Sequence, residues 1–212
     1  YDNDGDLDIL LTGDTGITRI SKVYRNTGGS FSEDTDINLT GVDNSSVAFG
    51  DYDNDGDLDI LLTGDSTGGG IAKIYRNTEG SFSEDTGINL TGVDNSSAAF
   101  GDYDNDGNLD ILITGYSSSG RIAKVYRNTG GNFSEDTGIN FTGIDNSSAA
   151  FGDYDNDGDL DILLIGDTGS VKISKVYQNN INISYFKHIT FRTNKPERSR
   201  HWSGCTFNVV CE

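Results

Sequence analysis

The stretch Asp51-Tyr52-Asp53-Asn54-Asp55-Gly56-Asp57-Leu58-Asp59, followed at once by Ile60-Leu61-Leu62, decides the fold of this 212-residue chain. It recurs at Asp102 to Asp110 and Asp153 to Asp161, and the chain opens inside a fourth copy at Tyr1 to Asp8. Carboxylates this dense repel one another unless a cation neutralises them. Alternating Asp side chains around a glycine turn predict a cage of oxygen ligands, which suits Ca²⁺. Zinc is not expected, because the repeats contain no Cys or His.

The loop differs from an EF-hand, which needs a Glu at its twelfth position and a helix on either side. The twelfth position here is Leu62, Ile113 or Leu164. The aliphatic run after the loop is short and ends at Thr-Gly or Ile-Gly, so it predicts a strand rather than a helix. The metal is therefore expected at the start of a strand.

A family resemblance rests on three motifs: Phe49-Gly50 before the loop, Asp-x-Asp-x-Asp-Gly-x-x-Asp within it, and Leu61-Leu62-Thr63-Gly64 after it. Together they resemble the FG-GAP or VCBS repeat of integrin-α-like β-propellers, over residues 1 to about 178. The resemblance implies an all-β fold of propeller blades with four antiparallel strands each. We expect about four such repeats, as part of a larger ring or assembly, with about one Ca²⁺ per repeat.

The resemblance also implies which residues hold the metal. Side chains at the first, third, fifth and ninth loop positions would be ligands, and the seventh position would contribute its carbonyl. The first copy lacks the first of these carboxylates. The candidate metal residues are Asp2, Asp4, Asp6 and Asp8; Asp51, Asp53, Asp55, Asp57 and Asp59; Asp102, Asp104, Asp106, Asn108 and Asp110; and Asp153, Asp155, Asp157, Asp159 and Asp161.

Tyrosines at equivalent positions set the period: Tyr1, Tyr52, Tyr103 and Tyr154 are 51 residues apart. Periods of about 40 to 50 residues with several short strands are typical of propeller blades. The sequence predicts repeats at 1–50, 51–101, 102–152 and 153–184, and a tail at 185–212 in which the repeat is lost. The tail could cap the last blade, contact a neighbouring subunit or belong to a following domain. Its Cys205 and Cys211 could form a disulfide or stay free.

Within one repeat we predict four strands. They are Ser46 to Asp51 near the propeller axis, Leu58 to Thr63 between neighbouring blades, Ile71 to Arg76, and Ser81 to Glu84 at the outer edge. The predicted turns are Ser66 to Gly70 and Asn77 to Gly80. The recurring aromatics, such as Phe49, Tyr75 and Phe82, could form a sugar-stacking platform, but we favour a role in filling the space between blades.

Asn-x-Ser/Thr sequons recur in the segments that join the repeats. They either accept N-linked glycans or are good turn formers that were copied with the repeat. The candidate glycosylation sites are Asn38, Asn44, Asn89, Asn95, Asn132, Asn140, Asn146 and Asn182.

The formal charge of −19 makes nucleic acid and anionic membranes poor partners. No segment has the roughly 20 apolar residues of a membrane span. Because the chain starts within a loop, the lack of a signal peptide in this sequence does not indicate whether the protein is exported. Weak extracellular-type calcium loops and many sequons favour a secreted or cell-surface protein.

The leading hypothesis is a calcium-stabilised extracellular structural or adhesive module that mediates protein interaction or self-assembly into a ring or fibre. The alternative is a lectin-like propeller that binds carbohydrate through equivalent weak sites. The ligand would then be a protein or glycan at the cell surface or in the matrix. An enzyme is not expected, because a near-perfect repeat with no Ser-His-Asp arrangement offers no asymmetric catalytic constellation.

Overall fold

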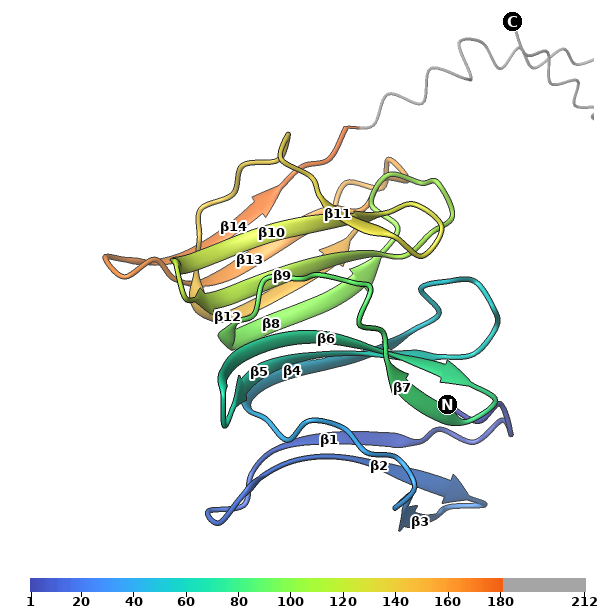
Figure 1. Ribbon diagram of the computed structural model, residues 1–212. Helices are drawn as coiled ribbons and strands as arrows, with labels where there is room; N and C mark the ends of the chain where they lie inside the picture. Colours follow the sequence, from blue (N-terminus) through green and yellow to red (C-terminus); the bar gives the residue numbers. More distant parts are fainter. Residues whose placement is uncertain (181–212) are drawn as a thin grey trace, which may run out of the picture. The chain divides into compact units, whose positions relative to one another are not determined.

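The computed structural model describes residues 1–180, which form an all-β structure without a helix in that range. Fourteen strands make four antiparallel sheets, which are the predicted blades (Figure 1). Blade 1 contains β1 (Ile9–Asp14), β2 (Arg19–Thr27) and β3 (Ser30–Glu33); blade 2 contains β4 (Asp43–Gly50), β5 (Asp59–Ser66), β6 (Gly69–Thr78) and β7 (Ser81–Glu84); blade 3 contains β8 (Asp94–Gly101), β9 (Asp110–Ser117), β10 (Gly120–Asn128) and β11 (Phe133–Glu135); blade 4 contains β12 (Asp145–Gly152), β13 (Asp161–Asp167) and β14 (Lys172–Tyr177).

The predicted strands are present, but the turns between them are tighter than predicted. The ladder between β5 and β6 continues to the pair Ser66 and Gly69, and that between β6 and β7 to the pair Thr78 and Ser81. The second of these turns has only Glu79 and Gly80 at its tip, both at positive φ, which suits the right-handed twist of a hairpin. The Gly and Asn residues that we assigned to loops thus extend the strands.

Blades 1 and 4 have three strands each in the described range, not the predicted four. The counterpart of β4 for blade 1 would fall before Tyr1. The counterpart of β7 for blade 4 falls where the repeat sequence is lost after Tyr177, and residues from 181 on lie outside the described range.

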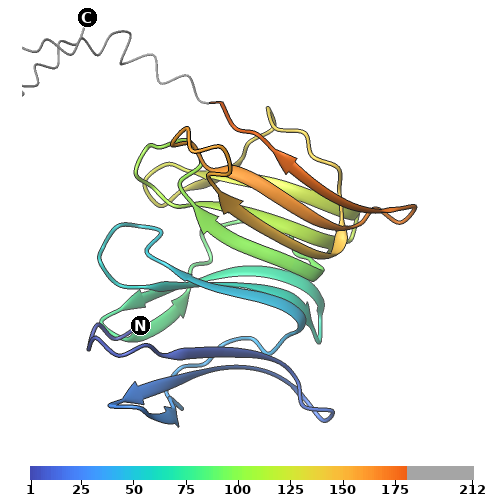
Figure 2. The same cartoon turned by 180° about the vertical axis from the view of Figure 1, so that it is seen from behind.

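The first strand of each repeat contacts the first strand of the next. β8 packs against both β4 and β12, and the two views agree on this order (Figures 1 and 2). Small side chains such as Ala98 and Ala99 allow the close approach. Each loop of the Asp motif joins this first strand to the second, so the loops of successive blades are neighbours in the fold.

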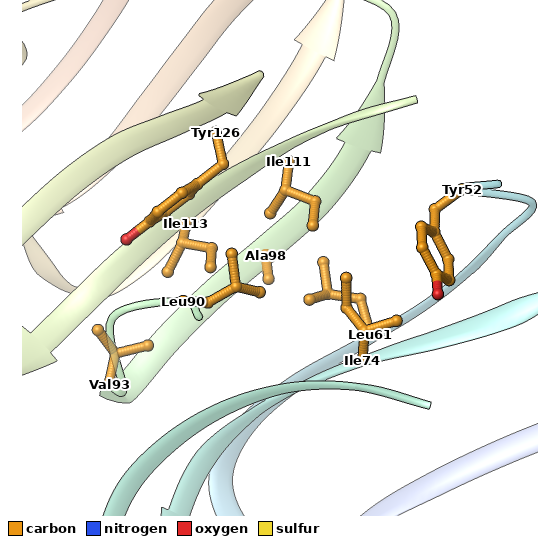
Figure 3. Close-up of a cluster of buried hydrophobic side chains, with 9 residues drawn as sticks. All are labelled: Tyr52, Leu61, Ile74, Leu90, Val93, Ala98, Ile111, Ile113 and Tyr126. Carbon is orange, nitrogen blue, oxygen red and sulfur yellow. The ribbon is translucent and has the colours of Figure 1, made fainter. Parts of the chain in front are cut away.

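The core lies between the blades. Tyr52, Leu61 and Ile74 of blade 2 face Ile111 and Ile113 of blade 3 across one cluster (Figure 3). The second strand is buried on both faces, as predicted, because its alternate residues face opposite neighbours. The aromatic prediction that we favoured also agrees with the structure: Phe49, Tyr75 and Phe82 pack into the cluster between blades 1 and 2.

The Phe-Gly pair that ends each first strand forms part of the contact between neighbouring blades. The ring of Phe100 lies against Gly50 of the preceding blade, where a Cβ would approach Cδ2 of that ring to 2.6 Å. The ring of Phe151 lies against Gly101 in the same way. The glycine is therefore required by the phenylalanine of the next repeat, and not by a turn.

Candidate metal centre

Three of the Asp loops bring carboxylates together. In each, one oxygen from the first, third and ninth loop positions lies within 4.8 Å of the other two. The groups are Asp51, Asp53 and Asp59; Asp102, Asp104 and Asp110; and Asp153, Asp155 and Asp161. We call them the Asp triads. Each precedes or begins the second strand of its blade, where the sequence predicts the metal.

The ninth residue anchors each triad to the sheet. Asp59 is fully buried, and its two oxygens accept the N–H groups of Tyr52 at 3.1 Å and Asn77 at 2.8 Å. Asp51 accepts the N–H groups of Asp55 and Gly56, both at 3.0 Å. Asn54 between them has a φ of 60°, a left-handed conformation that Asn tolerates better than most residues. The backbone thus fixes two members of the triad without help from a cation.

The third residue provides the observation that tests the fit of a cation. One oxygen of Asp53 binds Arg76 at 2.9 Å, and the other, Oδ1, is buried without a hydrogen-bond partner. The same oxygen is unpartnered in Asp2 and Asp104. Buried carboxylate oxygens nearly always have a partner, because leaving one unpaired is costly. A hard cation that prefers oxygen ligands fits this set of donors.

A repeated network holds the arginine in place. The Tyr52 hydroxyl donates to Asp85 at 2.7 Å and accepts from Arg76 at 3.0 Å, and Tyr1 and Tyr103 have equivalent partners. Burial and the hydrogen bond to a carboxylate raise the pKa of all three tyrosines, that of Tyr1 to about 12. The hydroxyl therefore stays protonated and continues to donate to the carboxylate.

The fifth and seventh loop positions make further contacts within and between the loops. Asp55 accepts the N–H of Asp57 at 2.9 Å and lies outside the triad, as do Asp106 and Asp157. Asp57 accepts from Asn3 of the preceding loop at 2.8 Å and from the Glu79 N–H at 2.8 Å. Equivalent bonds join Asn54 to Asn108 and Asn105 to Asp159. The seventh side chain thus ties successive loops together, a role that we did not predict although Asn occupies the fourth position of every loop.

The first and fourth copies differ from the middle two. In the first copy Asp8 accepts from the Tyr1 and Asn26 nitrogens, and Asp2 pairs with Arg25, but no complete triad is present there. Although burial raises the pKa of Asp8, these bonds outweigh it and hold that pKa below its usual value. In the fourth copy Gln178 replaces the arginine and donates to Asp155. The fourth triad therefore has no guanidinium beside it to offset its charge.

A model of the FG-GAP-like repeat matches the chain three times, at residues 1–62, 61–113 and 102–164. The chain belongs to the FG-GAP-like repeat family. Each matched segment contains an Asp loop and the start of the strand that follows it. The comparison with curated proteins finds no match. No helix in the described part of this FG-GAP chain is long and apolar enough to cross a membrane.

The remaining predicted sites divide between surface positions and the tail. The sequon residues Asn38, Asn44, Asn89, Asn132, Asn140 and Asn146 are exposed, and Asn95 is half-buried. Asn182, Cys205 and Cys211 lie outside the described residues. Glycosylation of these FG-GAP repeats stays a prediction.

The buried member of two FG-GAP triads titrates abnormally in the metal-free protein. Burial, together with the charge of the neighbouring loop carboxylates, raises the pKa of Asp59 to about 6 and that of Asp110 to about 7. Hydrogen bonds from Asn77 and Asn128 oppose this rise only in part. The metal-free loop therefore holds protons that a bound cation would displace.

This titration predicts a pH-dependent calcium effect. Because the folded-state pKa values lie above the ordinary value of 3.8, these groups stabilise the calcium-free fold fully below that pH, and the contribution is lost as the pH rises through 6 to 7. Calcium needs the deprotonated oxygens, so the rise in melting temperature on adding calcium should be larger at pH 8 than at pH 5. Thermal unfolding at both pH values checks this, and equal rises would contradict it.

Proposed function

We propose that this chain is a calcium-stabilised β-propeller module with a structural or adhesive role outside the cell. The observation that carries the proposal is the recurring Asp triad, which in blades 2 and 3 contains a buried carboxylate oxygen without a hydrogen-bond partner. In blade 2, Asp51, Asp53 and Asp59 would hold the ion, and the other triads would do the same. The ion would supply positive charge where the fold gathers carboxylates, so its binding energy becomes folding energy.

The chain's own residues set what the ion stabilises. Asp59 bonds to the backbone at Tyr52 and Asn77, so it connects the loop to both the second and the third strand. The Asn77 amide also donates to the carbonyl of Tyr1 in the preceding blade at 2.8 Å. An ordered loop therefore stabilises its own blade and the contact with the previous one. The function then lies in the surface that the ordered blades present to a protein or glycan partner.

The extracellular assignment is supported by two features. Calcium loops of weak extracellular modules have affinities of about 10⁻⁴ to 10⁻³ M, which suits calcium levels outside the cell. Six sequon asparagines are exposed at the surface, where glycans could be attached.

The replacement Asp53→Asn tests the proposal. It keeps the volume and an acceptor for Arg76, but it removes the charge at the unpartnered oxygen. Without calcium we expect little change in stability. With calcium, the rise in melting temperature should shrink by roughly a third, because one of three triads is disabled.

The matched control is Asp57→Asn, because Asp57 lies in the same loop but outside the triad. The chain itself carries Asn108 at the equivalent position of the third loop. This control should lower stability slightly, by the same amount with and without calcium, because it weakens only the bond to Glu79. If Asp53→Asn and Asp57→Asn reduce the calcium effect equally, the triad is not the calcium site.

A further inference from the structure

The third residue of the second Asp loop lies between two residues that the next blade holds. The carbonyl of Tyr52 accepts a hydrogen bond from the Asn128 side chain of blade 3 at 2.7 Å. The Asn54 side chain donates to Asn108 of the third loop at 3.0 Å. Asp53 lies between Tyr52 and Asn54 and is the triad member with the buried, unpartnered oxygen. Blade 3 therefore holds the residues on both sides of this candidate ligand of blade 2.

The same arrangement recurs one blade further along the chain. Asp104 of the third loop also has a buried oxygen without a hydrogen-bond partner. The carbonyl of Tyr103 before it accepts from the Asn179 side chain, which follows β14, at 2.7 Å. The side chain of Asn105 after it donates to Asp159 of the fourth loop at 2.8 Å. The contacts on both sides of the third loop residue are therefore a property of the repeat.

The two bonds beside Asp53 depend on different parts of blade 3. Asn128 is fully buried at the end of β10, so its bond comes from the sheet. Asn108 belongs to the third Asp loop, so its position depends on the order of that loop. Because the carboxylates of a loop repel one another without a cation, an ion in the third loop would fix Asn108 and, through it, Asn54. The bond between the two loops thus connects the order of one loop to a ligand of the other.

We propose that Asn54 and Asn105 couple the calcium sites, so that an ion in one loop raises the affinity of the loop before it. The inference rests on the proposed function and names its regulation. Both asparagines are positioning residues, because each adjoins a candidate ligand, Asp53 or Asp104, and neither belongs to a triad. Coupling between binding sites is reciprocal, so calcium binding by successive loops is cooperative.

Electrostatic repulsion between the ions opposes this coupling. An ion in one loop neutralises part of the negative charge that attracts the next ion. The tips of the loops are exposed, for example at Asn54 and Asn105. Salt screens exposed charges beyond a Debye length, which is about 8 Å at 0.15 M, whereas a direct hydrogen bond is not screened in this way. The test therefore uses 0.15 M salt, which weakens the repulsion.

The test is a calorimetric titration of the 212-residue chain with calcium at pH 7.5. The parent should bind with a Hill coefficient of at least about 1.5, because three triads are coupled. The double variant Asn54→Gly/Asn105→Gly removes both bonds between loops, and glycine keeps the left-handed backbone of the two asparagines, at φ 60° and 58°. Its Hill coefficient should fall to about 1 and its average affinity at least about fivefold. The number of bound ions and the melting temperature in a chelator should change little, because both side chains are exposed.

Asn44→Gly is the matched control for the loss of a left-handed asparagine. Asn44 is exposed at the start of β4, has a φ of 45° and lies outside the Asp loops. Its side chain donates to the adjacent Asp43 at 3.3 Å. The control should therefore titrate like the parent.

Two aspartate replacements separate the loss of the bond from a change of charge. Asn54→Asp can accept from the Asn108 amide, which has two N–H donors and uses one for Asp106 at 2.9 Å. Asn105→Asp instead places a carboxylate opposite Asp159. Both variants add one negative charge to an exposed loop, and Asp tolerates the left-handed backbone. The Hill coefficient should stay near that of the parent in Asn54→Asp and fall in Asn105→Asp.

Three results would overturn the coupling: a parent Hill coefficient at or below about 1, a double variant that keeps the Hill coefficient of the parent, or equal Hill coefficients in the two aspartate variants. The two proposals fail separately. Calcium binding without cooperativity contradicts only the coupling, whereas a parent that binds no calcium contradicts the proposed function and the coupling with it.

Discussion

The replacement Asp110→Ala is expected to destabilise the chain by about 3–5 kcal/mol in the presence of calcium. Asp110 is fully buried and accepts the N–H groups of Tyr103 at 3.0 Å and Asn128 at 2.8 Å. Alanine leaves both donors buried and unpaired, at a cost of about 1–3 kcal/mol each. It also removes one member of a triad. Equilibrium denaturation of parent and variant in calcium measures the loss.

Two comparisons isolate the cause of that loss. Glu135→Ala removes the same charge from the same blade, but Glu135 makes only an exposed ion pair with Lys124 at 2.8 Å, so its loss should stay below about 1 kcal/mol. Asp110→Asn keeps one acceptor and should lie between the two. If Asp110→Ala costs no more than Glu135→Ala, the buried carboxylate does not anchor the loop.

The replacement Gly101→Ala is expected to cost about 2–3 kcal/mol, because the added methyl group overpacks the contact between blades 3 and 4. The Cβ would lie 2.5 Å from Cδ2 and 2.8 Å from Cγ of Phe151. Neither atom is the end of a flexible side chain, so the whole ring must move. Equilibrium denaturation measures the change in the free energy of unfolding.

Gly152 provides a matched control at the same position of blade 4. No atom lies within 4 Å of a Cβ built there, so Gly152→Ala should change stability by less than about 0.5 kcal/mol. Both replacements reduce the freedom of the unfolded chain equally, so their difference reports the clash alone. Combining Gly101→Ala with Phe151→Leu should recover part of the loss. Equal effects of the two glycine replacements would contradict the packing of Phe151 on Gly101.

Much of the fold follows from the sequence because its signals are local and repeated. The period of 51 residues, the Asp loop before an aliphatic strand and the short edge strand each depend on residues close together in the chain. Ser81–Glu84 was predicted with its observed bounds. The strand ends at Ser66 and Gly69 were missed, because glycine usually indicates a turn and ladder pairing here outweighs that preference.

The candidate site was harder to predict, because contacts between residues far apart in the sequence determine which carboxylates come together. Composition cannot distinguish Asp55 from Asp53, since both are loop carboxylates. In the structure Asp55 turns back to the N–H two residues on, a local bond typical of Asp, whereas Arg76 holds Asp53 in the triad. The bond from Asn54 to Asn108 spans two repeats, so no local pattern could reveal it.

The sequence shows that Gln178 replaces the arginine of the other repeats, but it does not show which residue that position contacts. The structure shows that the arginine position faces the third loop residue in every blade, so Gln178 contacts Asp155 without a positive charge. The same comparison explains the Phe-Gly pair. From the sequence alone, the glycine of the pair indicates a turn. In the structure, Gly101 lies against the ring of Phe151 in the next blade.

The most direct test of stabilisation by calcium is the melting temperature of the 212-residue chain at pH 7.5, measured first with excess calcium and then with a chelator. We expect a large rise with calcium that the chelator reverses, because a cation would neutralise the gathered carboxylates of each triad and contact the unpartnered oxygens of Asp53 and Asp104. Magnesium should give a smaller rise, since it demands a tighter octahedral set of ligands. Equal melting temperatures with calcium and with chelator would contradict calcium binding at the triads and leave them as acidic turns without a bound ion.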